Sequence, residues 1–249
     1  MSEPVAPARS RHTKEEKVTQ KTSTDPPTWL IGYNLLSGCL WSFVFLNVFA
    51  TYLTFGNLLQ TFELTHYWTT AIQCCAIIEV INAATGVVKS PVITTAMQVA
   101  SRLLVVLGVW TVLPEASGNT SYAYLTVHFA WGVAEVVRYY YYANHLISQQ
   151  RQAPGIAPPQ VPKFLLWLRY NAFLVLYPMG ISSECYMVYR AVGAALARGT
   201  SGFTAYALFL CIVLIAYVPG TVVLFSHMLH QRAKQQKTLK TKKVDSKSE

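Results

Sequence analysis

Tyr177 and Glu184 are the residues of this sequence whose types and spacing best suit acid–base chemistry. They lie seven residues apart in an apolar stretch that runs from Val161 to Arg190. In a helix, an advance of about 100° per residue would place both side chains on one face, together with Tyr170. Because a carboxylate forms at lower pH than a phenolate, we expect Glu184 to act as a base and Tyr177 as an acid. Burial and a nearby guanidinium act on both groups, so the reverse assignment stays open.

The distance between these residues limits how they could act together. Seven residues rise about 10.5 Å along a helix axis, too far for both groups to reach adjacent carbon atoms directly. Pro178 lacks a backbone N–H and should kink the helix between them, with Gly180 easing the bend. We therefore expect this kink and long side chains to close the gap.

The stretch that carries the pair is long enough to cross a bilayer. Of the 249 residues, 53% are hydrophobic and 12% are charged, which is typical of a polytopic membrane protein. We expect an all-α fold, with six transmembrane helices of about 20 residues or more in one bundle. The expected spans cover residues 29–53, 67–88, 92–113, 122–143, 161–190 and 203–229.

Polar segments flank the expected bundle. Residues 1–28 are predicted to be a disordered tail, residues 29–230 the transmembrane domain, and residues 231–249 a basic disordered tail. Most Lys and Arg lie in the two tails, so the positive-inside rule places both termini in the cytoplasm, as an even number of spans requires. Arg190 and Arg198, in the fifth loop, are exceptions to this rule.

Composition also argues against several other classes of protein. The net charge of +9 arises mostly in the tails and accompanies no nucleic-acid-binding motif, so we expect no nucleic-acid partner. The five cysteines form no C-x-x-C pair, and we expect no disulfide, no metal site and no cofactor. Cys185 and Arg190 are separated by four residues rather than five, so a cysteine phosphatase loop is absent.

Six charged residues lie in the interior of the expected spans, away from the span ends. If all faced lipid, the penalty would be on the order of 15 to 20 kcal/mol, so they must point into the bundle. They are Glu79, Arg102, Glu135, Arg138, Arg169 and Glu184. Glu135 and Arg138 are three residues apart and could form a local ion pair. Structural pairing and a working site therefore both remain open for this set.

Three motifs give the sequence a resemblance to a known family. They are L-R-Y-x-x-F-x-x-L-Y-P-x-G-x-x-x-E around Tyr177, A-W-x-x-x-E-x-x-R-Y-x-Y-Y around Glu135, and E-x-x-x-A-x-x-G-x-V-x-S-x-x-x-x-T-x-x-Q-x-x-S-R from Glu79 to Arg102. Over about residues 29–230 the chain resembles the very-long-chain 3-hydroxyacyl-CoA dehydratases, also called protein tyrosine phosphatase-like proteins. The resemblance implies an enzyme that eliminates water from (3R)-3-hydroxyacyl-CoA to give trans-2-enoyl-CoA, the third step of fatty-acid elongation.

The resemblance also implies roles for individual residues. The family's tyrosine of L-Y-P and the glutamate seven residues on form the catalytic pair and match Tyr177 and Glu184. Supporting roles are implied for Arg169, Gly180, Arg102, Glu135 and Arg138. We expect the CoA phosphates near Lys163, Arg169 or Arg138, since arginine suits phosphate, with the acyl chain running between helices toward Glu184.

A location and partners follow from the same resemblance. It implies a multi-pass protein of the endoplasmic reticulum membrane that has cytoplasmic termini and works beside the condensing enzyme, ketoreductase and enoyl reductase of elongation. The tail, with Ser246 and Lys247, lacks a dilysine retrieval signal. A small transporter or channel and an inactive scaffold of the elongation complex remain alternatives. No internal repeat supports the transporter, and the presence of both Tyr177 and Glu184 argues against the scaffold.

Overall fold

The described part of the chain is helical throughout its regular elements. The computed structural model describes residues 27–88, 90–150 and 161–248, with side chains up to residue 238. Within these ranges no strand occurs, which confirms the all-α prediction. The elements are α1 (Thr28–Phe55), α2 (Leu58–Cys74), α3 (Ile77–Ala84), α4 (Val92–Leu103), the π-helical η1 (Leu104–Thr111), α5 (Tyr122–Gln150), α6 (Lys163–Asn171), α7 (Phe173–Ala197) and α8 (Ser201–Ser248).

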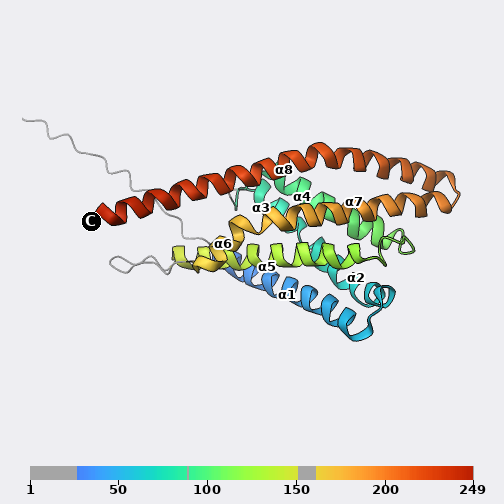
Figure 1. Cartoon of the computed structure of the whole chain (residues 1–249), viewed down its shortest axis with the longest axis horizontal. Helices are drawn as coiled ribbons and strands as arrows, with labels where there is room; N and C mark the ends of the chain where they lie inside the picture. Colours follow the sequence, from blue (N-terminus) through green and yellow to red (C-terminus); the bar gives the residue numbers. More distant parts are fainter. Residues whose placement is uncertain (1–26, 89, 151–160, 249) are drawn as a thin grey trace, which may run out of the picture.

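Helix α5 lies at the centre of the bundle. It packs against α1 on one side and α7 on the other, and α8 runs along the outer side of α7 (Figure 1). Gly132 of α5 permits the close approach of α1, because a Cβ atom there would lie 2.7 Å from the Phe45 ring. Helix α2 packs against α1, and α3 against α4. This arrangement surrounds α5 with helices from both halves of the chain.

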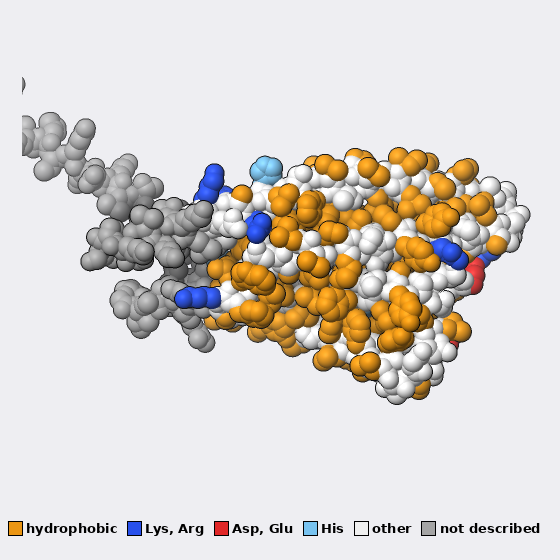
Figure 2. Space-filling model, viewed as in Figure 1, with side chains coloured by type: hydrophobic (Ala, Val, Ile, Leu, Met, Phe, Trp, Pro, Cys, Tyr) orange, Lys and Arg blue, Asp and Glu red, His pale blue; other side chains and the backbone are white. Residues whose placement is uncertain are grey.

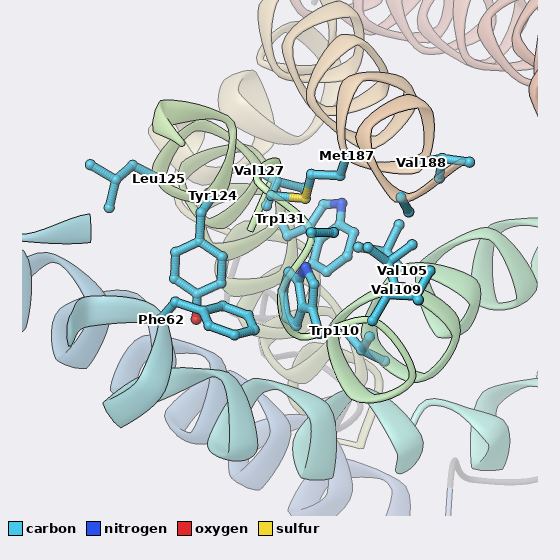
Figure 3. Close-up of a cluster of buried hydrophobic side chains, with 14 of the residues drawn as sticks. Phe62, Val105, Val109, Trp110, Tyr124, Leu125, Val127, Trp131, Met187 and Val188 are labelled. Carbon is cyan, nitrogen blue, oxygen red and sulfur yellow. The ribbon is translucent and has the colours of Figure 1, made fainter. Parts of the chain in front are cut away.

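The core is formed by large side chains from α1, α2, η1, α5 and α7. Trp110 of η1 lies beside Tyr124 and Trp131 of α5, and Met187 of α7 closes the cluster on the other side (Figure 3). All four side chains are at most 2% exposed. Aromatic rings dominate here because they bury large areas and pack edge to face.

The outer surface is apolar, as expected of a protein surrounded by lipid. Figure 2 shows hydrophobic side chains over most of the visible face, with Lys and Arg toward its two ends. Leu53, Ile93 and Ile215 are 72 to 81% exposed. Apolar side chains exposed over so much of a surface are rare on soluble monomers. The chain is therefore a helical membrane protein.

Length and composition mark out fewer spans than the six expected. Three helical segments are long and apolar enough to cross a membrane, namely α1, α4 with η1, and residues 201–238 of α8. The bent pair α6 and α7 makes a fourth if it counts as one span. The expected span over residues 67–88 is instead two helices, α2 and α3, which meet at Cys75 and Ala76.

Local signals explain where α1 ends and α2 begins. Gly56 adopts a left-handed φ of 63° and its N–H bonds to the Tyr52 carbonyl, which closes the last turn of α1. The side chain of Asn57 then accepts a 3.1 Å hydrogen bond from the N–H of Gln60 and caps α2. Helix α2 thus starts well before Tyr67, where the expected span began.

The stretch from Val161 to Arg190 bends at a different place from the one expected. Helices α6 and α7 meet at Ala172 with a bend of 45°, whereas α7 continues through Pro178. The Asn171 side chain donates to the Trp167 carbonyl at 2.8 Å and accepts from Arg232 of α8 at 3.0 Å. These side-chain bonds compete with helix continuation and tie the end of α6 to α8.

The C-terminal end of α8 also differs from expectation. Residues 231–249 were expected to be disordered, yet α8 remains helical to Ser248. This segment contains neither proline nor glycine and is rich in Lys and Gln, which favour helix. The expected N-terminal tail, residues 1–28, lies outside the described residues apart from its last two.

The two arginines that break the positive-inside rule are both held by the loop that follows η1. Arg198 binds both carboxylate oxygens of Glu115, at 2.7 and 3.0 Å. The Nε of Arg190 donates to Ser117 at 2.8 Å. Their hydrogen bonds to this loop give these arginines a structural role at the end of the bundle.

Candidate active site

A cavity of about 720 Å³ lies inside the bundle and contains both residues of the expected pair. Tyr177 and Glu184 line it from α7, and residues of α1, α2, α3, α4, α5 and α8 complete its wall. The volume falls in the usual range for small-molecule sites. The lining is mostly apolar, so the few polar groups in it define where a ligand can be recognised.

Glu184 is held by two neutral donors. Its carboxyl group is buried, and Oε1 accepts a 2.9 Å hydrogen bond from Nε1 of Trp131 on α5. Oε2 accepts a 3.0 Å bond from the Tyr217 hydroxyl on α8. An indole N–H can only donate, so Oε1 is an acceptor in this arrangement. Neither of these bonds comes from a cation, so nothing in them neutralises a carboxylate at this position.

Tyr177 is half-buried and is held by α8. Its hydroxyl donates to the Thr221 carbonyl at 3.2 Å, and its ring stacks on Phe225 with centroids 5.6 Å apart. A carbonyl can only accept, so the phenol carries its proton here. Because α7 and α8 are antiparallel, Thr221 lies opposite Tyr177 and Tyr217 opposite Glu184. Two hydrogen bonds between these helices thus fix the two ends of the pair.

Gly180 allows close packing between α7 and α5. A Cβ atom at this position would lie 3.3 Å from the Cβ of Ala130. The residue lines the cavity, and the helix does not break beside it. Its role in the structure is therefore close helix contact rather than relief of a bend.

Four of the six charged residues expected inside the spans neutralise one another. Arg138 binds both oxygens of Glu79 at 2.6 Å each and also contacts Glu135, to which its Nε donates at 2.8 Å. Arg102 forms an ion pair with the other oxygen of Glu135, and Tyr139 donates to Glu79. The expected pair of Glu135 and Arg138 is therefore present as part of a larger network. The network joins α3, α4 and α5 and lines the cavity.

The three residues expected near the CoA phosphates differ in their availability. Arg138 is occupied by two carboxylates. Arg169 lines the cavity and donates to the Tyr142 hydroxyl at 3.3 Å, and no carboxylate among the described side chains pairs with it. Lys163 is exposed at the start of α6 and does not line the cavity. Arg169 is the best placed of the three to meet an anionic group of a ligand in the cavity.

Comparison with known proteins assigns the chain to a protein family. The sequence model described as "Protein tyrosine phosphatase-like protein, PTPLA" matches residues 73–238 of the 249. The chain belongs to this family. No solved structure gives a significant match to the chain.

Relatives of this PTPLA protein cover most of its length. A Caenorhabditis elegans protein named very-long-chain (3R)-3-hydroxyacyl-CoA dehydratase hpo-8 is 34% identical over 83% of this chain and 94% of the relative. A Schizosaccharomyces pombe protein named probable very-long-chain (3R)-3-hydroxyacyl-CoA dehydratase is 36% identical over 81% and 89%. The human very-long-chain (3R)-3-hydroxyacyl-CoA dehydratase 2 is 27% identical over 83% and 80%.

Three residues of the PTPLA site were not selected from the sequence. Trp131 stands inside the motif A-W-x-x-x-E, but the sequence does not reveal that its N–H reaches Glu184. Tyr217 and Thr221 lie in the sixth expected span, next to Pro219. The sequence did offer one signal for Tyr217, which is a tyrosine in the middle of an apolar span. Its hydroxyl group needs a hydrogen-bond partner, so the side chain should point into the bundle and not toward lipid.

Proposed function

We propose that this PTPLA protein is a very-long-chain (3R)-3-hydroxyacyl-CoA dehydratase of fatty-acid elongation. It eliminates water from (3R)-3-hydroxyacyl-CoA to give trans-2-enoyl-CoA. The relatives that cover most of the chain carry this name. The observation that carries the proposal is a buried carboxyl group and a protonated phenol, Glu184 and Tyr177, lining one apolar cavity.

Each residue of the pair has a role in the elimination. Glu184 removes the proton from carbon 2, and that C–H electron pair forms the double bond to carbon 3. Tyr177 gives its proton to the hydroxyl group, which leaves carbon 3 as water. The hydrogen bonds support this assignment over the reverse, because Glu184 accepts from Trp131 while the Tyr177 hydroxyl donates.

The axial distance between the pair is closed by side-chain movement toward the substrate, because α7 continues through Pro178 without a break. The two groups share no direct hydrogen bond in the structure; each is held by a different residue of α8. A 3-hydroxyacyl thioester whose bond between carbons 2 and 3 lies across the cavity, rather than along α7, presents the carbon 2 proton to Glu184 and the 3-hydroxyl group to Tyr177. The Tyr177 ring can swing from Thr221 to the substrate, because it is only half-buried.

The CoA group lies toward Arg169 in this proposal. Arg169 and Tyr142 line the same cavity as the reacting pair, and Arg169 lies earlier in the stretch, in α6. A guanidinium suits phosphate because it offers several donors in a planar fork. Lys163, at the exposed start of the same helix, adds positive charge outside the cavity.

We further infer six membrane spans: α1, α2 with α3, α4 with η1, α5, α6 with α7, and α8. Broken and polar helices can span a membrane when other helices cover them, and α5 is covered by α1 and α7. The lysine-rich end of the chain supports a cytoplasmic C-terminus, and with six spans the N-terminus lies on the same side. Residence in the endoplasmic reticulum beside the condensing enzyme, ketoreductase and enoyl reductase is part of the proposal.

The mutual neutralisation of Glu79, Arg102, Glu135 and Arg138 supports an enzyme more than a transporter. Charges that line a transport path must be available to the transported ion or substrate, whereas these four are occupied by one another.

Conversion of a long-chain (3R)-3-hydroxyacyl-CoA to the trans-2-enoyl-CoA by the purified protein in detergent tests the function. Tyr177→Phe and Glu184→Gln should each abolish turnover while the protein still folds. If the parent protein is inactive, the proposed enzymatic function is wrong and the hypothesis of an inactive scaffold of the elongation complex remains. Full activity in one variant would remove only the role of that residue.

A further inference from the structure

Gln73 is a fully buried amide without a hydrogen-bond partner in the described protein. It is 0% exposed, and neither Oε1 nor Nε2 finds a donor or acceptor among the described residues. It lies at the end of α2 and lines the same cavity as Glu184. Buried amides are nearly always paired, because desolvating a donor and an acceptor without replacement is costly. An unpaired amide in a cavity wall is therefore available to bond to whatever occupies the cavity.

The packing of α2 on α5 shows where this amide lies relative to the reacting pair. Thr65 bonds to Tyr124 at 2.8 Å, and Thr69 bonds to His128 at 2.9 Å. In both bonds the two residues are 59 positions apart. From the first bond to the second, both helices advance by four residues, which is about one helical turn, so α2 and α5 run parallel. The next step places Gln73 level with Gly132.

Gly132 has no side chain, and a Cβ atom there would face the Phe45 ring of α1 rather than Gln73, so the series of polar pairs stops there. The residue before it is Trp131, whose N–H holds Oε1 of Glu184. Figure 3 shows Trp131 beside Trp110 in the core, near Tyr124. Gln73 therefore lies at a similar height along α5 to the indole that positions the proposed base, and both residues line the cavity.

Several other polar groups of the cavity already have partners. The side-chain amide of Asn34 donates to the Leu30 carbonyl at 2.7 Å. Tyr139 donates to Glu79, and Tyr142 accepts from Arg169. These groups are occupied in the free protein, whereas both halves of the Gln73 amide remain available to a ligand.

We propose that the Gln73 amide binds the reacting end of the substrate. Oε1 accepts a hydrogen bond from the 3-hydroxyl group, and Nε2 donates one to the thioester carbonyl oxygen. This inference rests on the proposed dehydratase function. A 3-hydroxyacyl thioester presents these two oxygens on carbons 3 and 1, one a donor and one an acceptor, and the rest of the acyl chain is apolar. One amide group offers the complementary acceptor and donor side by side.

This contact has two consequences for the reaction. Negative charge moves to the thioester oxygen as the proton leaves carbon 2, and a fixed N–H donor stabilises that charge more than the ground state. The enoyl product lacks the hydroxyl group, so Oε1 loses its partner when water leaves. Gln73 therefore favours the substrate over the product and over saturated acyl-CoA.

Gln73→Met tests the proposal, because methionine has nearly the same length and shape without the amide. We measure kcat/KM for a long-chain (3R)-3-hydroxyacyl-CoA and the inhibition constant of the saturated acyl-CoA of equal chain length. The kcat/KM should fall about 100-fold, as for loss of one oxyanion donor. The inhibition constant should rise less than about tenfold, because only one ground-state bond to a neutral carbonyl is lost. The melting temperature should stay the same or rise, because an unpaired buried amide has been removed.

Thr69→Val is the matched control. Thr69 lies one turn earlier on α2, is fully buried and bonds to His128 rather than to the cavity. This variant should lower the melting temperature and leave the ratio of kcat/KM to acyl-CoA affinity unchanged. If Gln73→Met cannot be purified, Gln73→Asn serves instead, because it keeps an amide but withdraws it by one carbon and should lower kcat/KM at least tenfold.

Two results would overturn the proposal. One is an unchanged kcat/KM in the variant, which would mean that the amide is satisfied by water alone. The other is an equal loss of kcat/KM and of saturated acyl-CoA affinity, which would indicate a general change in packing. If the parent protein itself fails to convert the hydroxyacyl-CoA, the proposed function fails before this test is reached.

Discussion

The hydroxyl of Tyr217 donates a 3.0 Å hydrogen bond to Oε2 of Glu184 and joins the last long helix to the proposed catalytic base. One turn further along α8, the Thr221 carbonyl accepts a hydrogen bond from the hydroxyl of Tyr177. Helix α8 therefore positions both reacting groups of α7. The role of this outer helix in the site suggests several measurements.

Tyr217→Phe should slow the reaction without unfolding the protein. The variant keeps the ring and removes the donor to Glu184, a bond to a charged group that is worth about 1.5 to 3 kcal/mol. We expect kcat/KM to fall about 10- to 100-fold, mostly through kcat. Tyr206→Phe is the control, since Tyr206 on the same helix donates to the Gly108 carbonyl at 2.9 Å and does not line the cavity. Equal losses of activity in both variants would contradict a specific role for Tyr217.

Trp131→Phe should remove the other donor to Glu184. Trp110→Phe provides a comparison of the same size, because Trp110 is equally buried but its N–H has no partner in the described protein. Both changes leave a cavity and should lower the free energy of unfolding by about 1 to 3 kcal/mol. Only Trp131→Phe should also lower kcat by tenfold or more. A loss of kcat that is as large in Trp110→Phe would assign the effect to packing.

Arg138→Met should be strongly destabilising. It leaves Glu79 and Glu135 close together without the guanidinium that both contact. Removal of one partner of a buried ion pair typically costs about 3 to 5 kcal/mol. Thermal unfolding in detergent measures this loss, and Glu79→Gln added to Arg138→Met should recover part of it. No recovery would mean that repulsion between the two carboxylates is not the cause.

Arg169→Gln should affect substrate binding rather than folding. With no carboxylate partner to lose among the described side chains, the protein should keep its melting temperature. The KM for the CoA substrate should rise about tenfold, because the variant loses one charge-assisted hydrogen bond to a phosphate group. The corresponding pantetheine thioester, which lacks the nucleotide phosphates, should show no such difference between the variant and the parent. Lys163→Gln should have a smaller effect, since Lys163 lies outside the cavity.

The loop contact between Arg198 and Glu115 should make stability depend weakly on pH. The hydrogen bond from Arg198 lowers the pKa of the Glu115 carboxyl group below its ordinary value. The folded state therefore binds this proton less readily than the unfolded state, so the stabilisation is present above the ordinary glutamate pKa. It is lost as the pH falls through the lowered value in the folded protein. Melting curves of Glu115→Gln and the parent should converge at acidic pH and differ slightly at neutral pH, since the pair is partly exposed.

The helical fold and the inward orientation of the charged side chains could be predicted from the sequence, because both follow from general properties of the lipid bilayer. A bilayer cannot hydrogen-bond a bare backbone or solvate a charge, so apolar stretches must be helical and their charges must face other helices. Tyr177 and Glu184 were placed on one helix face by periodicity alone, and both line the cavity. The bend was misplaced at Pro178, because the side-chain bonds of Asn171, including one to α8, are invisible to local rules.

Partners of each polar group were decided only by the tertiary structure. Glu184 meets Trp131 and Tyr217, which are 53 and 33 residues away in the chain, and Arg138 meets Glu79, which is 59 residues away. Periodicity determines which face a residue occupies, but not which helix packs on that face or at what height. The sequence therefore determined that an acid and a base share a buried face. Helix packing decided that neutral donors hold the proposed base, that the other carboxylates pair with arginines, and that the amide of Gln73 remains available in the cavity wall.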